Sequence, residues 1–272
     1  MAEGDGKVRL VILDWAGTTV DYGCYAPTVV FVEVFRLKGV DISVAQARAP
    51  MGRAKREHIK AISQQPEVAE MWRAKHGKDC SDADVDDMFE QHFRPLQIEC
   101  IARYAGLIPG TLDAVAALRA KDMLIGTTTG YFTEAAEINR QEAERQGFAP
   151  DTMVCASDVP AGRPEPWMVM RNMELTGVFP PSVVVKVGDT LPDIGEGRNA
   201  GTWTVGLSKT GNEIGLNEEE LNALPDSEVN GRIAKAKRAL YDAGAHFVVE
   251  CIVDVPGVVD EIEQRLQKGE RP

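Results

Sequence analysis

The sequence has few of the features that mark membrane, secreted or disulfide-linked proteins. No apolar run approaches the roughly 18 residues that a membrane-spanning helix needs, and the N-terminal stretch MAEGDGKVRL lacks the long apolar core of a signal peptide. The five cysteines are scattered and form no C-x-x-C pair, which disfavours a disulfide framework or a zinc site. We therefore expect a protein of the reducing cytoplasm that has no membrane partner.

Positive charge is also scarce. The chain carries 30 Lys and Arg against 42 Asp and Glu, a formal net charge of -12. Because binding a phosphate backbone needs clustered positive side chains, we expect no nucleic-acid partner. An acidic protein can still bind a small anion in a locally positive pocket. The length of 272 residues allows one large domain, or a main domain that carries a smaller one.

Six aliphatic runs of strand length recur along the chain, at 8–14, 123–129, 152–158, 182–189, 202–207 and 246–252. Most are nearly continuous rather than alternating, as expected for strands that are buried on both faces. Helix-like segments separate several of them, at 111–121, 133–147, 166–177 and 193–201. This alternation predicts an α/β fold with a doubly wound parallel sheet.

One long segment between the first two strand runs interrupts this alternation. Its pattern is only helical, with candidate helices at 27–38, 43–49, 54–64, 66–76 and 82–103. We therefore expect an α/β core domain formed by residues 1–21 and 105–272, and a helical domain formed by residues 22–104. The junctions would lie near 20–24 and 104–109. Residues 208–245 are a weaker departure, which we expect to be charged, helical and peripheral.

Chemically useful side chains follow the predicted strands, where parallel α/β sheets bind their ligands. The motif DWAGTT offers the carboxylate of Asp14, and TTTG offers the hydroxyls of Thr128 and Thr129 to an anionic oxygen. A strand that ends in an aspartate and a Gly-Thr-Thr turn is suited to deliver a nucleophilic carboxylate to the edge of a sheet.

Two later motifs supply charge of both signs. Arg163, in AGRPEP, is suited to a phosphate group. Asp189 and Asp193, in GDTLPD, are hard oxygen ligands suited to Mg²⁺. Each motif alone also fits an ordinary turn, a surface helix start or a helix cap. The ordered set of four predicts phosphoryl transfer through an aspartyl-phosphate.

Together the motifs resemble the haloacid dehalogenase superfamily, over essentially the whole chain, and the helical insertion sits where that superfamily has its mobile cap. The resemblance narrows to the phosphonoacetaldehyde hydrolase (phosphonatase) family through DWAGTTVDYGCYAP, APMGRAKREH, TTTGY, DVPAGRPEPWM and VKVGDTLPDIGEGRNAGTWTVG. It implies Mg²⁺-dependent hydrolysis of the carbon–phosphorus bond of phosphonoacetaldehyde to acetaldehyde and phosphate. It also implies a metal held by Asp14, the backbone carbonyl of Ala16 and Asp189, with Asp193 in support.

Ala16 stands where many sites of this shape have a second acid that protonates the leaving oxygen. In a phosphonate the leaving atom is carbon, and an unstabilised carbanion is too poor a leaving group for protonation by one carboxylic acid to be sufficient. The chemistry therefore needs an electron sink on that carbon. A lysine imine supplies one.

The resemblance points to Lys55 as this lysine, in the first turn of a new helix, where the helix dipole disfavours a cation. Arg53 and Arg56 are expected to lower its pKa further. His58 lies on the same helix face and is a candidate proton carrier.

The remaining expected site residues line a small pocket between core and cap, where Thr129 and Arg163 hold the phosphoryl group. Gly52 would let the cap backbone approach closely. The other pocket residues are Met51, Cys24 and Tyr131. Lys55 and His58 also fit ordinary solvated positions on a cap helix, and the pocket residues fit plain packing.

Other functions stay open at this point. A phosphate-ester phosphatase of the same superfamily would lack its acid at Ala16, and a haloacid dehalogenase would not need the acidic GDTLPD motif. A non-catalytic module that binds a phosphoryl ligand would leave Lys55 and Asp14 unexplained. Met71 and Trp72 form an apolar stripe that is either cap core or a subunit contact, and the resemblance favours a homodimer through the cap.

Overall fold

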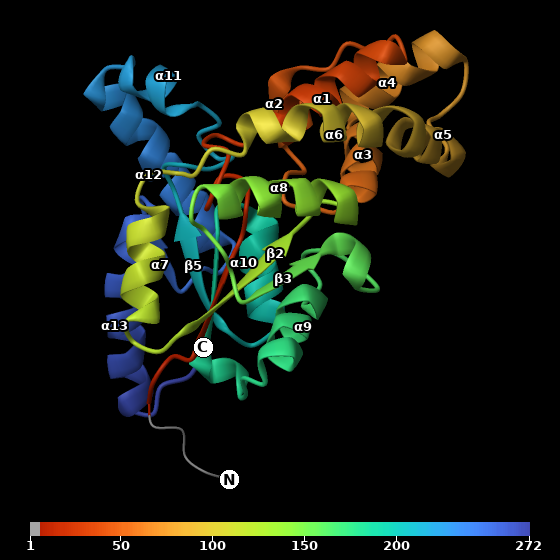
Figure 1. Ribbon diagram of the computed structural model, residues 1–272. Helices are drawn as coiled ribbons and strands as arrows, with labels where there is room; N and C mark the ends of the chain where they lie inside the picture. Colours follow the sequence, from red (N-terminus) through yellow and green to blue (C-terminus); the bar gives the residue numbers. More distant parts are fainter. Residues whose placement is uncertain (1–5) are drawn as a thin grey trace.

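The computed structural model describes residues 6–272 and is built on a six-stranded sheet (Figure 1). The strands are β1 (Leu10–Leu13), β2 (Leu124–Thr129), β3 (Thr152–Cys155), β4 (Val184–Gly188), β5 (Trp203–Leu207) and β6 (Phe247–Val249). Their order is β3-β2-β1-β4-β5-β6, and each neighbouring pair is parallel. The predicted strand segments and the doubly wound parallel α/β fold are confirmed.

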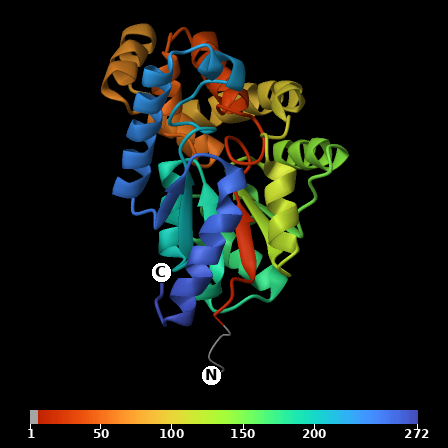
Figure 2. The ribbon, with the colours of Figure 1, turned by 90° about the vertical axis from the view of Figure 1, so that its left-hand side faces the viewer.

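Helices cover both faces of this sheet, as Figures 1 and 2 show. Val11 and Leu13 of β1 pack in one buried cluster with side chains of α7 (Thr111–Arg119) and α13 (Val255–Gln267). Leu10 and Ile12 point to the opposite face and pack with α9 (Trp167–Thr176) and with Ala200, at the end of α10 (Leu191–Asn199). Successive strand side chains face opposite ways, so a run that is aliphatic throughout is buried on both sides.

The direction of chain growth reverses between β1 and β4. From β1 the chain adds β2 and β3 on one side, and it then returns to add β4, β5 and β6 on the other. Where the strand order reverses, the loops that follow the two central strands separate and leave a crevice. The segments after β1 and β4 therefore border the expected binding site.

The helices between β1 and α7 lie above this carboxyl edge (Figure 1). They begin with α1 (Tyr25–Leu37), α2 (Val44–Arg48), α3 (Lys55–Ser63) and α4 (Pro66–His76). Their buried cluster also includes Phe132 and Ala135, at the start of α8 (Thr133–Arg145). The apolar packing of the insertion thus continues into the sheet-bearing part, and the predicted division into two domains stays a prediction.

The helix predicted over 82–103 is wrong as a single regular helix. The segment consists of α5 (Asp82–Asp87), a π-helical turn η1 (Met88–Phe93), α6 (Arg94–Cys100) and a 3-10 turn η2 (Ile101–Tyr104). Pro95 has no N–H, and its ring would clash with the carbonyl of Gln91 in a regular α-helix. A wider turn before the proline accommodates both effects.

The segment after β5 also differs from its prediction. It contains α11 (Glu218–Asn222) and α12 (Asp226–Asp242), which are helical as expected. Its first part, residues 208–216, is not peripheral, because the backbone N–H of Asn212 donates to Asp189 at 2.8 Å. This segment therefore borders the site. Further short 3-10 turns are η3 (Ala156–Asp158), η4 (Pro181–Val183) and η5 (Ile252–Asp254).

Trp72 is only 1% exposed and packs inside the cluster of the insertion, with Met71 half-buried against it. Of the two alternatives for this stripe, Trp72 belongs to the core and is not available for a subunit contact. The homodimer itself stays a prediction. Over residues 6–272, no helix has both the length and the apolar content that crossing a membrane requires.

Candidate active site

Two carboxylates meet at the carboxyl edge of the sheet because their strands are neighbours. Asp14 directly follows β1 and Asp189 directly follows β4. The N–H of Asp14 donates to Val187 O at 3.0 Å, which continues the ladder between these strands to their ends. Asp14 is 5% exposed and Asp189 is fully buried, so the sheet itself brings both acids to one point.

Asp193 completes an acidic cluster. One oxygen from each of Asp14, Asp189 and Asp193 lies within 4.8 Å of the other two. Burial, followed by the charges of Asp14 and Asp193, raises the pKa of Asp189 well above its usual value. Burial also raises the pKa of Asp14, although the charge of Arg163 opposes this. The cluster thus has more negative charge than its surroundings balance.

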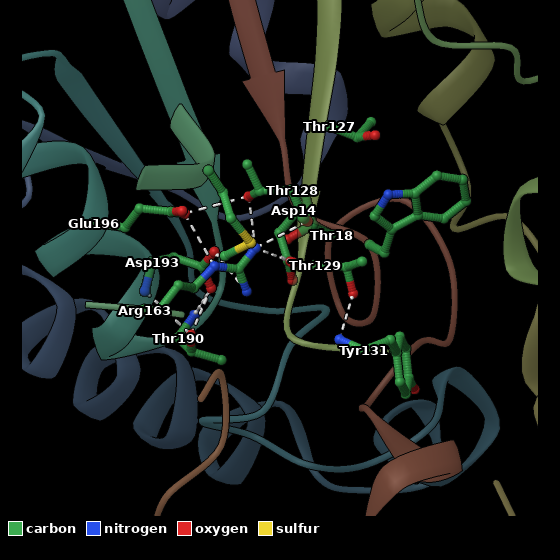
Figure 3. A network of polar contacts seen from close by, with 12 residues as sticks. Asp14, Thr18, Thr127, Thr128, Thr129, Tyr131, Arg163, Thr190, Asp193 and Glu196 are labelled. Carbon is green, nitrogen blue, oxygen red and sulfur yellow. Dashed lines mark hydrogen bonds and ion pairs between the residues drawn. The ribbon is translucent and has the colours of Figure 1, made fainter. Parts of the chain in front are cut away.

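Arg163 lies at the centre of this network, and Figure 3 shows it between Asp14 and Glu196. Its Nη2 donates to Asp14 Oδ1 at 2.6 Å, and its Nε donates to Glu196 Oε2 at 3.0 Å. Its Nη1 lies 3.2 Å from Asp193 Oδ1. The guanidinium is almost fully buried and is fixed on several sides, so its orientation toward Asp14 is set before any ligand binds.

Asp193 is held by the residues around it. Lys186 Nζ donates to its Oδ1 at 2.7 Å, and the Thr190 hydroxyl and N–H donate to its Oδ2. Burial alone would raise the pKa of Asp193, but the charges of Arg163 and Lys186 and these hydrogen bonds lower it below its usual value. Both oxygens of Asp193 therefore accept hydrogen bonds, which fixes the orientation of this carboxylate beside the other two.

The donor set fits a divalent cation. The buried network has four carboxylates (Asp14, Asp189, Asp193 and Glu196) and two cations that pair with them (Arg163 and Lys186), so ion pairs within it can balance at most two of the four carboxylates. Oxygen-only sites with carboxylates are typical of Mg²⁺ and Ca²⁺. Asp14, Asp189 and the carbonyl of Ala16, which also lines the cavity, are the groups that would hold the ion.

The two threonines that end β2 have different positions. Thr129 borders the cavity, and its hydroxyl accepts from the N–H of Tyr131 at 3.2 Å (Figure 3). Thr128 is fully buried behind it, where its hydroxyl accepts from Arg163 at 2.7 Å and donates to Glu196 at 3.2 Å. Thr129 therefore borders the cavity, whereas Thr128 lies outside its lining and contacts Arg163.

Lys55 enters the same cavity from the insertion. It is the first residue of α3, it is 6% exposed, and its ammonium lies 4.4 Å from the centre of the Tyr131 ring. Burial lowers its pKa to about 8, while the charges of Asp14 and Cys24 oppose the shift. An amine with such a pKa is partly neutral at physiological pH and is able to act as a nucleophile.

The expected cause of this low pKa needs a correction. Arg56 was expected to repel Lys55, but it points outward and pairs with Asp86 at 2.6 Å. Burial is the main cause, and the cation that contributes is Arg163. The sequence neighbours of a buried lysine are a poor guide to its surroundings, because adjacent helix positions face different directions.

His58 is buried behind Lys55 on the same helix, with its ring 3.8 Å from that of Phe31 between centroids. Its Nε2 lies 2.8 Å from Ala47 O, so this nitrogen carries the proton, and its Nδ1 has no hydrogen-bond partner. Burial, together with the charge of Lys55, lowers its pKa well below the usual value. His58 is thus a neutral imidazole with one free acceptor.

The cavity between these groups is small. The space open to the centre of a water molecule is about 20 Å³, enough for about one water. Twelve residues line it, and nine of them are predicted site residues: Asp14, Ala16, Cys24, Met51, Gly52, Lys55, Thr129, Tyr131 and Arg163. Met51, Gly52 and Lys55 come from the insertion side, and Asp14 and Arg163 come from the sheet side.

Gly52 is where the two sides come into contact. Its φ is +92°, and a Cβ there would lie 2.2 Å from Thr190 Oγ1, so both the backbone conformation and the space require glycine.

Cys24 also faces the acidic cluster, with its Sγ 3.4 Å from Asp189 Oδ2. Burial raises the pKa of this thiol well above its usual value, which makes it an inert neighbour.

The sequence analysis missed several residues of this site. Lys186 interrupts an aliphatic strand run. A lysine in a buried strand needs a buried acidic partner, so its presence indicated a charged network at this point. Glu196 follows Asp193 by three residues and so shares its helix face, which was a second signal. Asn212 gave no signal, because its loop is brought to Asp189 only by the fold.

Comparison with known proteins finds hydrolases that are similar to this chain over most of its length. A family model described as haloacid dehalogenase-like hydrolase matches residues 8–201. A phosphonoacetaldehyde hydrolase of Syntrophobacter fumaroxidans is 46% identical over 267 residues, which is 98% of this chain and 96% of that protein. One of Bacillus cereus is 42% identical over 259 residues, covering 95% of this chain and 98% of that protein.

Among solved structures, a phosphonoacetaldehyde hydrolase like protein from Oleispira antarctica matches with a TM-score of 0.95 and 37% identity. The match covers 97% of this chain and 96% of that one. A phosphoglucomutase-like structure from Bacteroides vulgatus matches with a TM-score of 0.66 at 17% identity, a likeness of fold alone.

Proposed function

This chain belongs to the phosphonoacetaldehyde hydrolase family of the haloacid dehalogenase-like hydrolases, and from this premise we propose that it hydrolyses the carbon–phosphorus bond of phosphonoacetaldehyde. The observation that carries the proposal is that Lys55 and Asp14 line opposite sides of one cavity. Ala16, which also lines it, stands where an ester hydrolase would need an acid. A buried amine next to a buried carboxylate suits a substrate that has an aldehyde at one end and a phosphoryl group at the other.

Lys55 acts first in the proposed reaction. Its neutral amine adds to the aldehyde carbon, and loss of water leaves a protonated imine. Tyr131 supports this step, because its ring face stabilises a cation and its bulk excludes water. We propose that His58, whose Nδ1 has no hydrogen-bond partner and which follows Lys55 by three residues on the same helix, accepts and returns protons during imine formation and hydrolysis.

Asp14 acts second. An oxygen of its carboxylate attacks phosphorus, and the electrons of the carbon–phosphorus bond move into the protonated imine and form an enamine. Arg163 and Thr129 hold the phosphoryl group while its charge changes. Asp14, the Ala16 carbonyl and Asp189 would hold a divalent cation, proposed to be Mg²⁺, which would supply positive charge to the phosphoryl oxygens.

The cycle closes with two hydrolyses. The enamine carbon gains a proton, and water then releases acetaldehyde from Lys55. A second water cleaves the aspartyl-phosphate and regenerates Asp14. Imine formation releases one water and these two steps consume two, so one water is used for each substrate.

Substrate entry requires the two sides of the cavity to separate, because a space for about one water cannot admit phosphonoacetaldehyde. We assign this movement to residues 22–104 as a cap, with the core formed by residues 1–21 and 105–272. Two backbone hydrogen bonds join the chain crossings, Asp21 N–H to Gly106 O at 3.1 Å and Ile108 N–H to Thr19 O at 2.9 Å. Such paired crossings suit a hinge.

The test measures acetaldehyde and phosphate released from phosphonoacetaldehyde with Mg²⁺, with glycerol phosphate as a comparison substrate. The wild type is expected to release both products in equal amounts and to leave the ester almost untouched. K55R and D14N are expected to fall to background. K60R is the matched control, because Lys60 lies on the same helix but pairs with Asp82 at the surface.

Two results would overturn the proposal. One is turnover of glycerol phosphate at a rate above that of phosphonoacetaldehyde, which would indicate an ordinary phosphatase. The other is a K55R variant that is as active as K60R, which would remove the amine from the reaction.

A further inference from the structure

The turn that carries Lys55 contacts a segment of the core that the proposed chemistry does not use. Arg48, the last residue of α2, places its guanidinium over residues 211–215. Its Nη1 donates to Gly23 O at 2.6 Å and lies 3.4 Å from Asn212 Oδ1. Asn212 Nδ2 in turn lies 3.4 Å from Arg48 O. The two residues thus contact each other through both side chain and backbone.

Asn212 continues this contact into the acidic cluster. Its backbone N–H donates to Asp189 Oδ2 at 2.8 Å, which fixes one oxygen of that carboxylate. The loop is packed tightly against Arg48 as well: Gly215 has φ +68°, and a Cβ there would lie 2.9 Å from Arg48 Cζ. Movement of Arg48 away from this loop would therefore change the surroundings of Asp189.

Arg48 also begins the turn that leads to Lys55. The N–H of Met51 donates to Arg48 O at 2.9 Å, and this is the same carbonyl that faces Asn212 Nδ2. Gly52 and Lys55 follow within one and four residues of Met51. A single backbone carbonyl therefore connects the start of this turn with the loop that orients Asp189.

We propose that Arg48 and Asn212 are a pair of positioning residues that align the Lys55 amine with the Asp14–Asp189 centre when the cap is closed. The inference rests on the proposed function, since it concerns the alignment of the same two groups. Neither residue lines the cavity that would hold the substrate. Their role is needed because Lys55 and Asp14 lie on different sides of a seam that opens, and a misplacement of about 1 Å can cost about 100-fold in rate.

A general adhesion between cap and core is the competing explanation, and the chain offers a control for it. Arg94, at the start of α6, pairs with Glu134 of α8 at 2.6 Å and stacks on Phe132. This contact also joins the insertion to the core through an arginine. None of Arg94, Glu134 and Phe132 lines the cavity.

The test is a double-mutant cycle of R48A, N212A and the R48A/N212A double variant, with R94A as control. We expect each single variant to lower kcat/KM at least about tenfold, and the double variant to be no worse than the poorer single variant, because the pair acts as a unit. Hydrogen exchange at the amides of residues 51–58, measured without substrate, is expected to quicken in all three and to stay at the wild-type rate in R94A. All rates are measured well below the unfolding temperature of each variant.

Two outcomes would overturn the proposal that Arg48 and Asn212 act as a pair. In one, the effects of R48A and N212A multiply in the double variant, which would mean that they act independently. In the other, R94A quickens exchange at residues 51–58 as much as R48A does, which would mean that cap adhesion alone is measured. A wild-type protein inactive on phosphonoacetaldehyde would count against the proposed function only, since the exchange comparison still decides whether the pair holds the turn.

Discussion

At the scale of single residues, the site is explained by an exchange of one acid for one amine. In the proposed mechanism, Ala16 leaves the site without the acid that would protonate a leaving oxygen, and the imine formed on Lys55 accepts the electrons of the carbon–phosphorus bond. The value of this exchange depends on burial, since an exposed lysine would be almost entirely protonated near pH 7 and slow to form an imine. The structure buries Lys55 almost completely against Tyr131.

The lowered pKa of Lys55 leads to a prediction on pH. Only the neutral amine adds to an aldehyde, so the rate of imine formation is expected to rise about tenfold per pH unit below the pKa and to level off above it. With a pKa of about 8, the bend lies near pH 8. The measurement is the initial rate of borohydride trapping from pH 6 to 10. A rate that still rises tenfold per pH unit up to pH 10, as for a lysine with the ordinary pKa of 10.5, or no dependence on pH, would contradict the account.

Position 16 offers a second test at this scale. A16D restores a carboxylic acid next to the nucleophile, so hydrolysis of glycerol phosphate is expected to rise by about 100-fold or more, as general acid catalysis commonly gives. Turnover of phosphonoacetaldehyde is expected to fall, because the new charge lies beside the acidic cluster. A16S is the matched control that adds a polar side chain without an acid. If A16S and A16D gain equally on the ester, the acid is not what position 16 lacks.

The sequence predicted the residues whose position follows from a strand end. Asp14, Thr129 and Asp189 come directly after aliphatic runs, and parallel strands deliver such residues to one edge. The surroundings of Lys55 could not be predicted in this way, because the residues that bury it come from distant segments. The same holds for Asn212, whose contact with Asp189 spans 23 residues.

At the scale of elements, the aliphatic runs were a reliable guide and the long helical run was not. All six strands appear within the predicted aliphatic runs, and the central strands have nearly continuous runs because a central parallel strand is buried on both faces. The run over 82–103 satisfied a helical period throughout, yet Pro95 divides it into α5, η1, α6 and η2. Periodicity reports which face is apolar and does not report the hydrogen-bond register.

The ion pairs between β4 and α10 give a prediction on stability. Lys186 is 1% exposed and serves both Asp193 and Glu196, at 2.7 and 3.5 Å. Removing one partner of a buried charge network leaves the others uncompensated, so K186M is expected to lower the free energy of unfolding by about 3–5 kcal/mol. Denaturant unfolding of the metal-free protein measures this.

Arg73 provides the control for that experiment, since its pair with Asp79 is exposed on α4. R73A is expected to change the free energy of unfolding by less than about 1 kcal/mol. If K186M and R73A lower the free energy of unfolding equally, the buried network stabilises the fold no more than an exposed ion pair does.

At the scale of the whole molecule, an acidic protein places an excess of negative charge at one buried point. The net charge of -12 is spread over the chain, but the carboxylates of the site are held together by the order of the strands. Burial and mutual repulsion raise the pKa of Asp189, so folding makes this site ready for a cation. The overall acidity was visible in the sequence, whereas this concentration of charge depends on the strand order, which brings β1 and β4 together.

A divalent cation is therefore expected to stabilise the folded protein. At a Mg²⁺ concentration 100 times the dissociation constant, the gain is about 2.7 kcal/mol. Unfolding of the wild type with and without Mg²⁺ measures the gain, and D189N is expected to lose most of it. A D189N variant that gains as much stability as the wild type would place the metal elsewhere.

The central claim is that Lys55 forms a covalent imine with the substrate while Asp14 receives the phosphoryl group. Borohydride added during turnover of phosphonoacetaldehyde with Mg²⁺ reduces such an imine to a stable amine, which mass spectrometry of a digest locates. The account predicts a two-carbon adduct on Lys55, accompanied by loss of activity. Continued release of phosphate with no adduct on Lys55 would contradict it.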